Sequence, residues 1–127
     1  MKEAAGHFDV KLTPVTGPDA PVGRMTLDKT FHGDLDATSV GEMLAVGTSI
    51  DGSAGYVAME KVTGRLGGRS GSFALQHSGT MNRGTPTLIV SVVPDSGTEE
   101  LEGLTGTMSI DRSGGQHAYR FQYSLPD

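Results

Sequence analysis

Apolar residues alternate with polar residues along most of the chain. Near the start, Phe8, Val10 and Leu12 are separated by charged or polar side chains. Near the end, every second position over nine residues is aromatic, histidine or leucine: His117, Tyr119, Phe121, Tyr123 and Leu125. Successive side chains of a β-strand point to opposite faces, so a period of two is typical of strands with one buried face. The pattern therefore predicts β-structure and argues against helices.

Turn-forming sequences divide this pattern into about eight segments at a spacing typical of sandwiches and barrels. Examples are the stretch from Gly17 to Pro21, the pair Asp51-Gly52 and the run from Ser113 to Gly115. No segment has the length and periodicity of a helix that could connect parallel strands. We therefore predict an all-β protein, a single antiparallel eight-stranded β-barrel that forms one domain over residues 1–127.

Three segments depart from simple alternation. The run from Leu88 to Val93 is the most apolar, which predicts a strand buried on both faces. The stretch from Gly64 to Gly71 holds four glycines and two arginines and is interpreted as a loop. Ser96 and Glu99 have the spacing of a helix capping box, which predicts one short helical turn at most.

Composition excludes several classes of function. The chain has 127 residues, no cysteine and a net charge of -5. The absence of cysteine excludes disulfides and thiolate metal sites, and the scattered basic residues argue against binding of nucleic acid. No apolar run approaches the roughly 20 residues of a membrane helix, and the first residues lack the apolar core of a signal peptide. We therefore expect a cytoplasmic protein without membrane or nucleic-acid partners. No G-x-G motif occurs, which excludes dinucleotide fingerprints and kinase glycine loops.

Several stretches resemble a bacterial family of uncharacterised proteins, a domain-of-unknown-function family. They are Gly23 to Lys29, Phe31 to Leu35, Gly52 to Ala58, Gly71 to Met81 and Val93 to Thr98. The resemblance covers most of the chain, and the fourth stretch is the most specific. It implies a barrel like that of plant allene oxide cyclase, which is related to the lipocalin-like barrels. No stretch matches the motifs of the cyclase itself, so the resemblance implies no catalytic residue.

Polar residues within two adjacent predicted strands are the candidates for chemistry. Glu60 shares one face of its strand with Tyr56, and either Gln76 or His77 must face inward from the next strand. We expect Glu60 and one of these two residues to line the barrel interior together. A buried carboxylate would have a raised pKa and could act as a general acid or base.

Purely structural roles are the alternative to a chemical role for the same residues. A buried polar group is satisfied by a hydrogen bond inside the protein as readily as by a ligand. If the pair is structural, Glu60→Gln is expected to be nearly neutral or stabilising, since it removes a buried charge. Glu60 could also form a salt bridge at the rim with Arg65 or Arg69.

A metal site is the weaker hypothesis for the histidines. His32, Asp34 and Asp36 are spaced so that all three would share one face of a strand, but such a row is more often a solvated face. The four histidines show no ligand spacing such as H-x-H. We predict neither a metal nor a cofactor.

Three functional hypotheses follow from a barrel with a few inward polar groups. The first is a binding module for a small apolar molecule in the barrel cavity. The second is a cofactor-free isomerase or cyclase that uses Glu60 or His77 as acid or base. The third is a structural barrel with a filled core, and we expect a homo-oligomer formed through the outer faces of the barrels to be favoured over a monomer.

Overall fold

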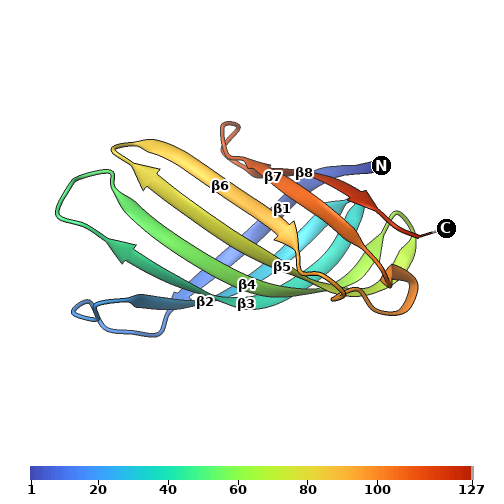
Figure 1. The fold of residues 1–127 in the computed structure, drawn as a ribbon, viewed down its shortest axis with the longest axis horizontal. Coiled ribbons are helices and arrows are strands. Elements are labelled where there is room, and N and C mark those ends of the chain that lie inside the picture. The colour runs from blue at the N-terminus through green and yellow to red at the C-terminus, as the bar shows by residue number, and fades with distance from the viewer. Residues whose placement is uncertain (127) are drawn as a thin grey trace.

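Eight antiparallel strands close into one barrel in the structure, a computed structural model that describes residues 1–126 (Figure 1). Each strand pairs with its neighbour in sequence, and β8 returns to pair with β1. The predicted all-β fold and the eight-stranded antiparallel barrel are confirmed. In chain order the elements are β1 (Lys2–Pro14), β2 (Gly23–Gly33), β3 (Leu35–Gly47), β4 (Ala54–Leu66), β5 (Arg69–Asn82), β6 (Thr85–Val92), the 3-10 turn η1 (Glu99–Leu101), β7 (Thr105–Asp111) and β8 (His117–Ser124).

The turn between β4 and β5 is shorter than the sequence predicts. Both strands extend into the glycine-rich stretch, and only Gly67 and Gly68 connect them. Their φ angles are 56° and 85°, and a positive φ at both central positions is what a two-residue hairpin turn of type I′ requires. The prediction of a loop from Gly64 to Gly71 is therefore wrong, because the glycines permit a tight hairpin and close approach between strands.

The packed core occupies one end of the barrel, where the termini lie (Figure 1). Phe73 and Phe121 stack with their ring centroids 5.8 Å apart, and Phe31 meets Tyr119 edge to face at 5.7 Å. All four side chains are almost fully buried. This end of the barrel is therefore filled by side chains.

The segment after β6 covers this packed end. Leu101 of η1 is buried and lies against Gly71, where an added Cβ would approach the Leu101 side chain to 3.2 Å. The predicted capping box is wrong: Thr98 precedes η1 without a side-chain cap, and the Ser96 hydroxyl accepts a hydrogen bond from the Ala74 amide instead. Within residues 1–126, no helix is long and apolar enough to cross a membrane.

The opposite end of the barrel is open, and we call it the mouth. Its rim consists of the four turns at residues 15–22, 48–53, 83–84 and 112–116 (Figure 1). Leu12, Met81 and Leu88 share the inward face of their strands with buried residues, yet they are 46%, 41% and 37% exposed. The interior is therefore accessible to solvent from this side.

Strand β6 runs from the mouth into the core, which corrects the prediction for Leu88 to Val93. Ile89 points outward and is 61% exposed, and Leu88 faces the open mouth; only Val90 and Val92 are buried. The apolar run is thus not buried on both faces. Its β7 side is also sparsely paired, at Val90 with Met108 and at Ser91 with Thr107.

One buried hydroxyl holds the hairpin between β2 and β3. Tyr119 Oη accepts a hydrogen bond from the Leu35 amide at 2.9 Å and donates to the His32 carbonyl at 2.9 Å. We expect Tyr119→Phe to lower the free energy of unfolding by about 1–3 kcal/mol, because it leaves a buried amide without a partner. Urea denaturation measures this change. The matched control is Tyr123→Phe, whose hydroxyl has no hydrogen-bond partner among residues 1–126, and an equal loss in both variants would contradict the assignment.

Candidate functional site

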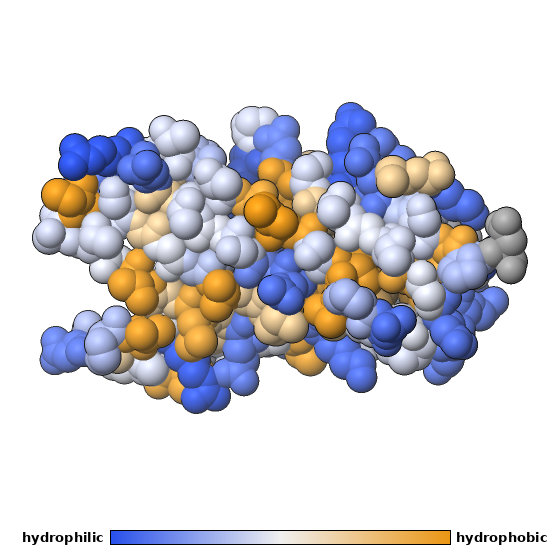
Figure 2. Space-filling model, viewed as in Figure 1, coloured by the Kyte–Doolittle hydropathy of each residue, from blue (hydrophilic) through white to orange (hydrophobic). Residues whose placement is uncertain are grey.

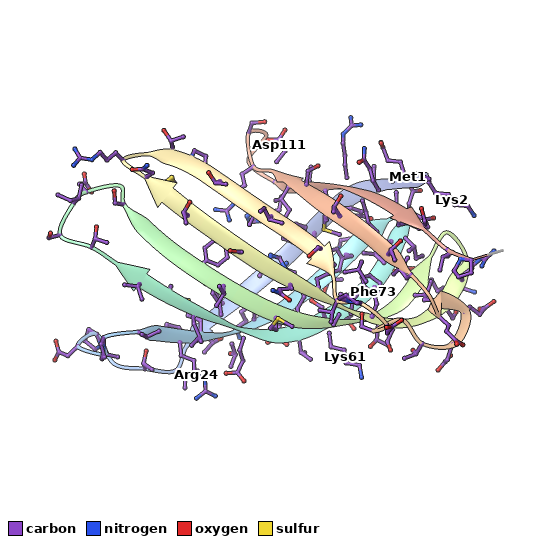
Figure 3. The ribbon with its side chains drawn as sticks, viewed as in Figure 1. Met1, Lys2, Arg24, Lys61, Phe73 and Asp111 are labelled. Carbon is purple, nitrogen blue, oxygen red and sulfur yellow. The ribbon has the colours of Figure 1, made fainter. Side chains whose placement is uncertain are left out.

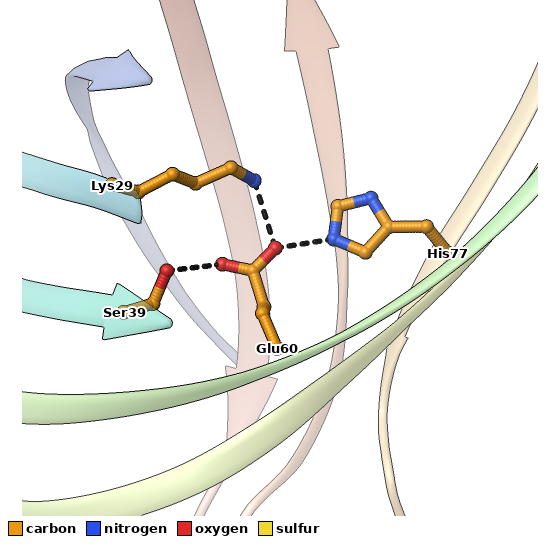
Figure 4. A network of polar contacts seen from close by, with 4 residues as sticks. All are labelled: Lys29, Ser39, Glu60 and His77. Carbon is orange, nitrogen blue, oxygen red and sulfur yellow. Dashed lines mark hydrogen bonds and ion pairs between the residues drawn. The ribbon is translucent and has the colours of Figure 1, made fainter. Parts of the chain in front are cut away.

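Four successive strands each direct one polar side chain into the middle of the barrel. Lys29 comes from β2, Ser39 from β3, Glu60 from β4 and His77 from β5 (Figure 4). In the strand register Lys29 lies opposite Ser39, whereas Glu60 is a diagonal neighbour of both Ser39 and His77. Diagonal neighbours on one face are within reach of long side chains. The pairing of the strands therefore brings all four groups to the Glu60 carboxylate.

The Glu60 carboxylate accepts three hydrogen bonds. Lys29 Nζ donates to Oε2 at 2.8 Å, His77 Nε2 lies 2.5 Å from the same oxygen, and Ser39 Oγ donates to Oε1 at 2.7 Å. The Glu60 side chain is 0% exposed, and those of Lys29 and His77 are each 6% exposed. We call these four residues the polar floor, because they separate the packed core from the mouth.

The ionisation of Glu60 is fixed by its neighbours. Burial raises the pKa of the carboxyl group, but hydrogen bonds from His77 and Lys29 and the charge of Lys29 outweigh burial and lower the pKa to about 2. The expectation of a raised pKa is therefore wrong, because Lys29 supplies a positive charge inside the barrel. Since the folded pKa lies below the usual 4.5, this interaction stabilises the fold above pH 4.5 and is lost as the pH falls from there toward 2.

Glu60 also sets the tautomer of His77. An ionised carboxylate only accepts hydrogen bonds, so His77 Nε2 must carry a hydrogen. His77 Nδ1 has no hydrogen-bond partner among residues 1–126, and the whole side chain is only 6% exposed. His77 therefore turns a free ring nitrogen away from Glu60.

Aromatic rings hold the Lys29 ammonium from the other side. Nζ lies 4.7 Å from the centroid of the Phe8 ring and 5.7 Å from that of Phe31. Cations are attracted to ring faces, and the attraction is stronger in a desolvated site. His117 in turn stacks on the Phe8 ring, with the two ring centroids 4.9 Å apart. Lys29 is thus placed by two aromatic rings and one carboxylate.

Tyr56 lies above the polar floor, on the wall of the mouth. It shares the inward face of β4 with Glu60, and its ring packs over Gly79, where an added Cβ would lie 2.4 Å from a ring atom. Its hydroxyl has no hydrogen-bond partner among residues 1–126. Burial raises the pKa of this hydroxyl, and the positive charge of Arg112 opposes the effect. Tyr56 therefore faces the same interior as Glu60, but the two side chains form no hydrogen bond with each other.

Of the four candidate residues, the structure brings Glu60, His77 and Tyr56 into the interior and leaves Gln76 outside. Gln76 is exposed on the outer face because it is adjacent to the inward-facing His77 on one strand. The alternative of a rim salt bridge is also wrong: Arg65 and Arg69 are exposed, and Glu60 pairs with Lys29.

Sequence reasoning missed Lys29 and Ser39. Both occupy positions of the inward alternation: Lys29 lies between Leu27 and Phe31, and Ser39 follows Leu35 and Ala37. The sequence did contain a signal, namely a lysine among the inward-facing apolar positions of one strand. A charged side chain on a buried face needs a partner of opposite charge, so this lysine indicates a buried ion pair.

The row His32, Asp34 and Asp36 does not form on one strand. Gly33, with a φ angle of 107°, ends β2, so the three residues straddle a hairpin turn. His32 Nε2 instead lies 3.1 Å from Asp9 Oδ2 on β1. Among residues 1–126, no three His, Asp or Glu side chains are grouped so that they could hold a metal ion.

The contributions of the Lys29 and Glu60 charges to the free energy of unfolding are expected to depend strongly on each other. Glu60→Gln leaves a buried ammonium without an anion, so we now expect a loss of about 3–5 kcal/mol in the free energy of unfolding, and not a neutral effect. The double variant Lys29→Met with Glu60→Gln removes both charges and is expected to recover most of that loss. Urea denaturation of the two single variants and the double variant measures the coupling energy.

The exposed pair Arg120 and Glu3, whose atoms Nη1 and Oε1 are 3.1 Å apart, is the control for this cycle. Its coupling energy is expected to stay below about 1 kcal/mol, since solvent screens exposed charges. Equal coupling in the two pairs, or a neutral Glu60→Gln variant, would contradict the role assigned to the polar floor.

Comparison with known proteins gives a family and similar solved structures. The chain is similar to a protein of unknown function of the DUF3224 family from Shewanella oneidensis MR-1, whose crystal structure superposes with a TM-score of 0.94. The two sequences are 51% identical, and the match covers 100% of this chain and 98% of the other. No curated protein matches the chain. Residues 4–123 match the family model described as "Protein of unknown function (DUF3224)", and the chain therefore belongs to the DUF3224 family.

Proposed function

We propose that the protein is a small-molecule-binding module that holds one apolar ligand in the mouth of the barrel. The observation that carries the proposal is the exposure of inward-facing apolar side chains above the polar floor. Leu12, Met81 and Leu88 are each more than a third exposed although they point into the barrel. A binding site for a small molecule is typically concave and apolar, with a few polar groups that orient the ligand.

The two ends of the barrel have different roles in this proposal. At the packed end, η1 and the aromatic cluster fill the interior, which supports rigidity of the walls. At the mouth, a ligand would cover apolar surface that otherwise contacts water, and each square ångström covered contributes about 25 cal/mol. The polar floor then limits how deep the ligand descends.

Glu60 argues against acid catalysis in the same space. A general acid must carry a proton near the working pH, whereas the pKa of Glu60 is about 2. Both oxygens of Glu60 are also engaged in hydrogen bonds with protein groups. Ligand binding therefore fits the site better than isomerase or cyclase activity, because binding does not require Glu60 to donate a proton. The cytoplasmic location and the likeness to the allene oxide cyclase barrel stay predictions.

An uncharged fluorescent dye tests the proposal directly. We expect Nile red to bind with a stoichiometry of one per chain and to gain fluorescence in the apolar mouth. Leu88→Glu is expected to weaken this binding at least tenfold, because it places a charge on the inner wall. Fluorescence titration of the wild-type protein and the variant measures the change.

Ile89→Glu is the matched control, since Ile89 is the adjacent residue on β6 and points outward. It is expected to leave the affinity for Nile red unchanged. Equal effects of the two substitutions, or no binding by the wild-type protein, would refute a ligand site in the mouth.

The outer face of the barrel supports self-association as a second candidate function. In the strand register Leu44, Val57 and Ile89 lie in one outward row across β3 to β6, with Ser78 between the last two. They are 45%, 51% and 61% exposed, and contiguous exposed apolar surface is characteristic of protein interfaces. Figure 2 shows apolar residues gathered on the visible face of the barrel.

A charge in the middle of this row tests self-association. We expect light scattering of the wild-type protein at micromolar concentration to give a multiple of 13.2 kDa, and Val57→Glu to reduce the mass to that of one chain. Lys61→Glu, a change at an outward position on the same strand, is the control and should keep the oligomer. A wild-type mass of 13.2 kDa would contradict this candidate.

A further inference from the structure

The outer surface of the barrel has a charged half and an uncharged half. The outward positions of β8, β1, β2 and β3 carry charges of both signs, on Glu3, Asp9, Lys11, Arg24, Asp28, Asp36, Glu42 and Arg120. The outward positions in the middle of β4 to β7 carry none, and we call them the uncharged strip: Gly55, Val57, Met59, Gln76, Ser78, Thr80, Thr87, Ile89, Ser91, Thr107 and Ser109. Lys61 and Asp111 lie beyond the ends of this strip. Since outward side chains of both halves would meet water in a monomer, the difference indicates that the uncharged strip has other surroundings.

The charges of the chain favour this strip as the contact between two copies. Each copy has a net charge of -5, so any contact through the charged half would bring like charges together. The cores of protein interfaces are depleted of charged residues. The strip also holds the exposed apolar residues Val57, Met59 and Ile89, which are 51%, 49% and 61% exposed. A copy of the same chain therefore meets no opposing charge in the middle of this face.

A shallow groove of about 380 Å³ lies in the strip at its mouth end. Leu44, Val46 and Val57 form its apolar walls, and Gly55 lies between them without a side chain. A Cβ added at Gly55 would lie 3.8 Å from its nearest neighbour, the Gly79 carbonyl oxygen, so the space above this glycine is open. The groove can therefore receive an apolar side chain from outside the molecule.

The strand register places a protruding residue at the matching distance from this groove. Val57 and Ile89 both pair with Ser78, one from β4 and the other from β6. A two-fold axis that runs along β5 at Ser78 exchanges the two sides of β5, so it brings Ile89 of each copy over Val57 of the other. A two-fold interface requires this reciprocity, since a contact of one residue with another must occur twice. The face is therefore complementary to itself.

The area of this half of the barrel is sufficient for a stable dimer. A specific interface buries about 800 Å² on each partner. The molecule has 7711 Å² of accessible surface, so about a tenth of it would have to be covered. The strip spans four of the eight strands, so this area is available without the charged half.

We infer that a second copy of this chain packs on the uncharged strip about a two-fold axis along β5, with Ile89 of each copy in the groove of the other. This inference rests on self-association, the second candidate function above, since it names the face, the symmetry and the contacts of that association. The two sheets pack face to face, and the charged half of each copy stays in water. The mouth is not part of the contact, so ligand binding is independent of it.

A side chain that fills the groove tests the contact. Gly55→Gln is uncharged and has room in the monomer, and it is expected to raise the dissociation constant of the dimer about tenfold or more, because it excludes Ile89 of the other copy from a central pocket of the interface. Light scattering over a dilution series measures the constant. The matched control is Gly114→Gln, at an exposed glycine in the turn between β7 and β8 that also has open space, and it should dimerise like the wild-type protein. Equal constants for the wild-type protein and Gly55→Gln would overturn the inference.

Cross-linking locates the axis without disturbing the groove. The chain has no cysteine, so Ser78→Cys introduces a single thiol at the position that the axis relates to itself. We expect a short bismaleimide to join two copies of this variant, and not of Thr13→Cys, whose exposed residue lies on β1 at the opposite side of the barrel. A dimer in solution that is cross-linked equally in both variants, or in neither, would overturn the inference while self-association stands. A wild-type protein that scatters light as a single chain would refute self-association and the inference together.

Discussion

A carboxylate buried inside the barrel is the constraint on which the centre of this molecule depends. Glu60 has no contact with water, and an isolated buried charge would be driven to neutralise. The fold compensates it with an ammonium, an imidazole and a hydroxyl, each from a different strand. The register of β2 to β5 must be correct for these groups to meet, because a slip of one residue would turn Glu60 to the outside. The network thus favours one register of these strands, whereas apolar contacts alone would tolerate more than one register.

The same network divides the interior into two parts with different properties. Below it, Phe31, Phe73 and Phe121 exclude solvent, and η1 covers the end. Above it, Leu12, Met81 and Leu88 point inward and yet stay partly exposed at the mouth. In Figure 3 the side chains are dense at the end near Phe73 and sparser toward the opposite turns. A packed base beneath an accessible apolar opening is the arrangement from which the binding proposal derives.

Much of the fold could be predicted from the alternation of residues, whereas the composition of the site could not. Period two identifies the strands, since each has one inward face, and it correctly groups Tyr56 with Glu60. The partner Lys29 lies 31 positions away in sequence, and its contact with Glu60 depends on strand register and on the reach of its side chain, which no local pattern contains. The pKa of Glu60 was mispredicted for the same reason. The errors at Gly64 to Gly71 and at Leu88 to Val93 arose where a tight hairpin and the open mouth override local composition.

The order of the strands has a consequence for how the chain reaches this structure. Every pairing joins neighbours in sequence except that of β1 with β8, which brings the two ends of the chain together. Hairpins can therefore form early and locally, and a single long-range closure completes the cylinder, with the loop-closure entropy concentrated in that step. The junction of β6 and β7 has the shortest ladder, with two residue pairs. Once the cylinder is complete, local opening should begin along this seam, where the fewest backbone hydrogen bonds must break.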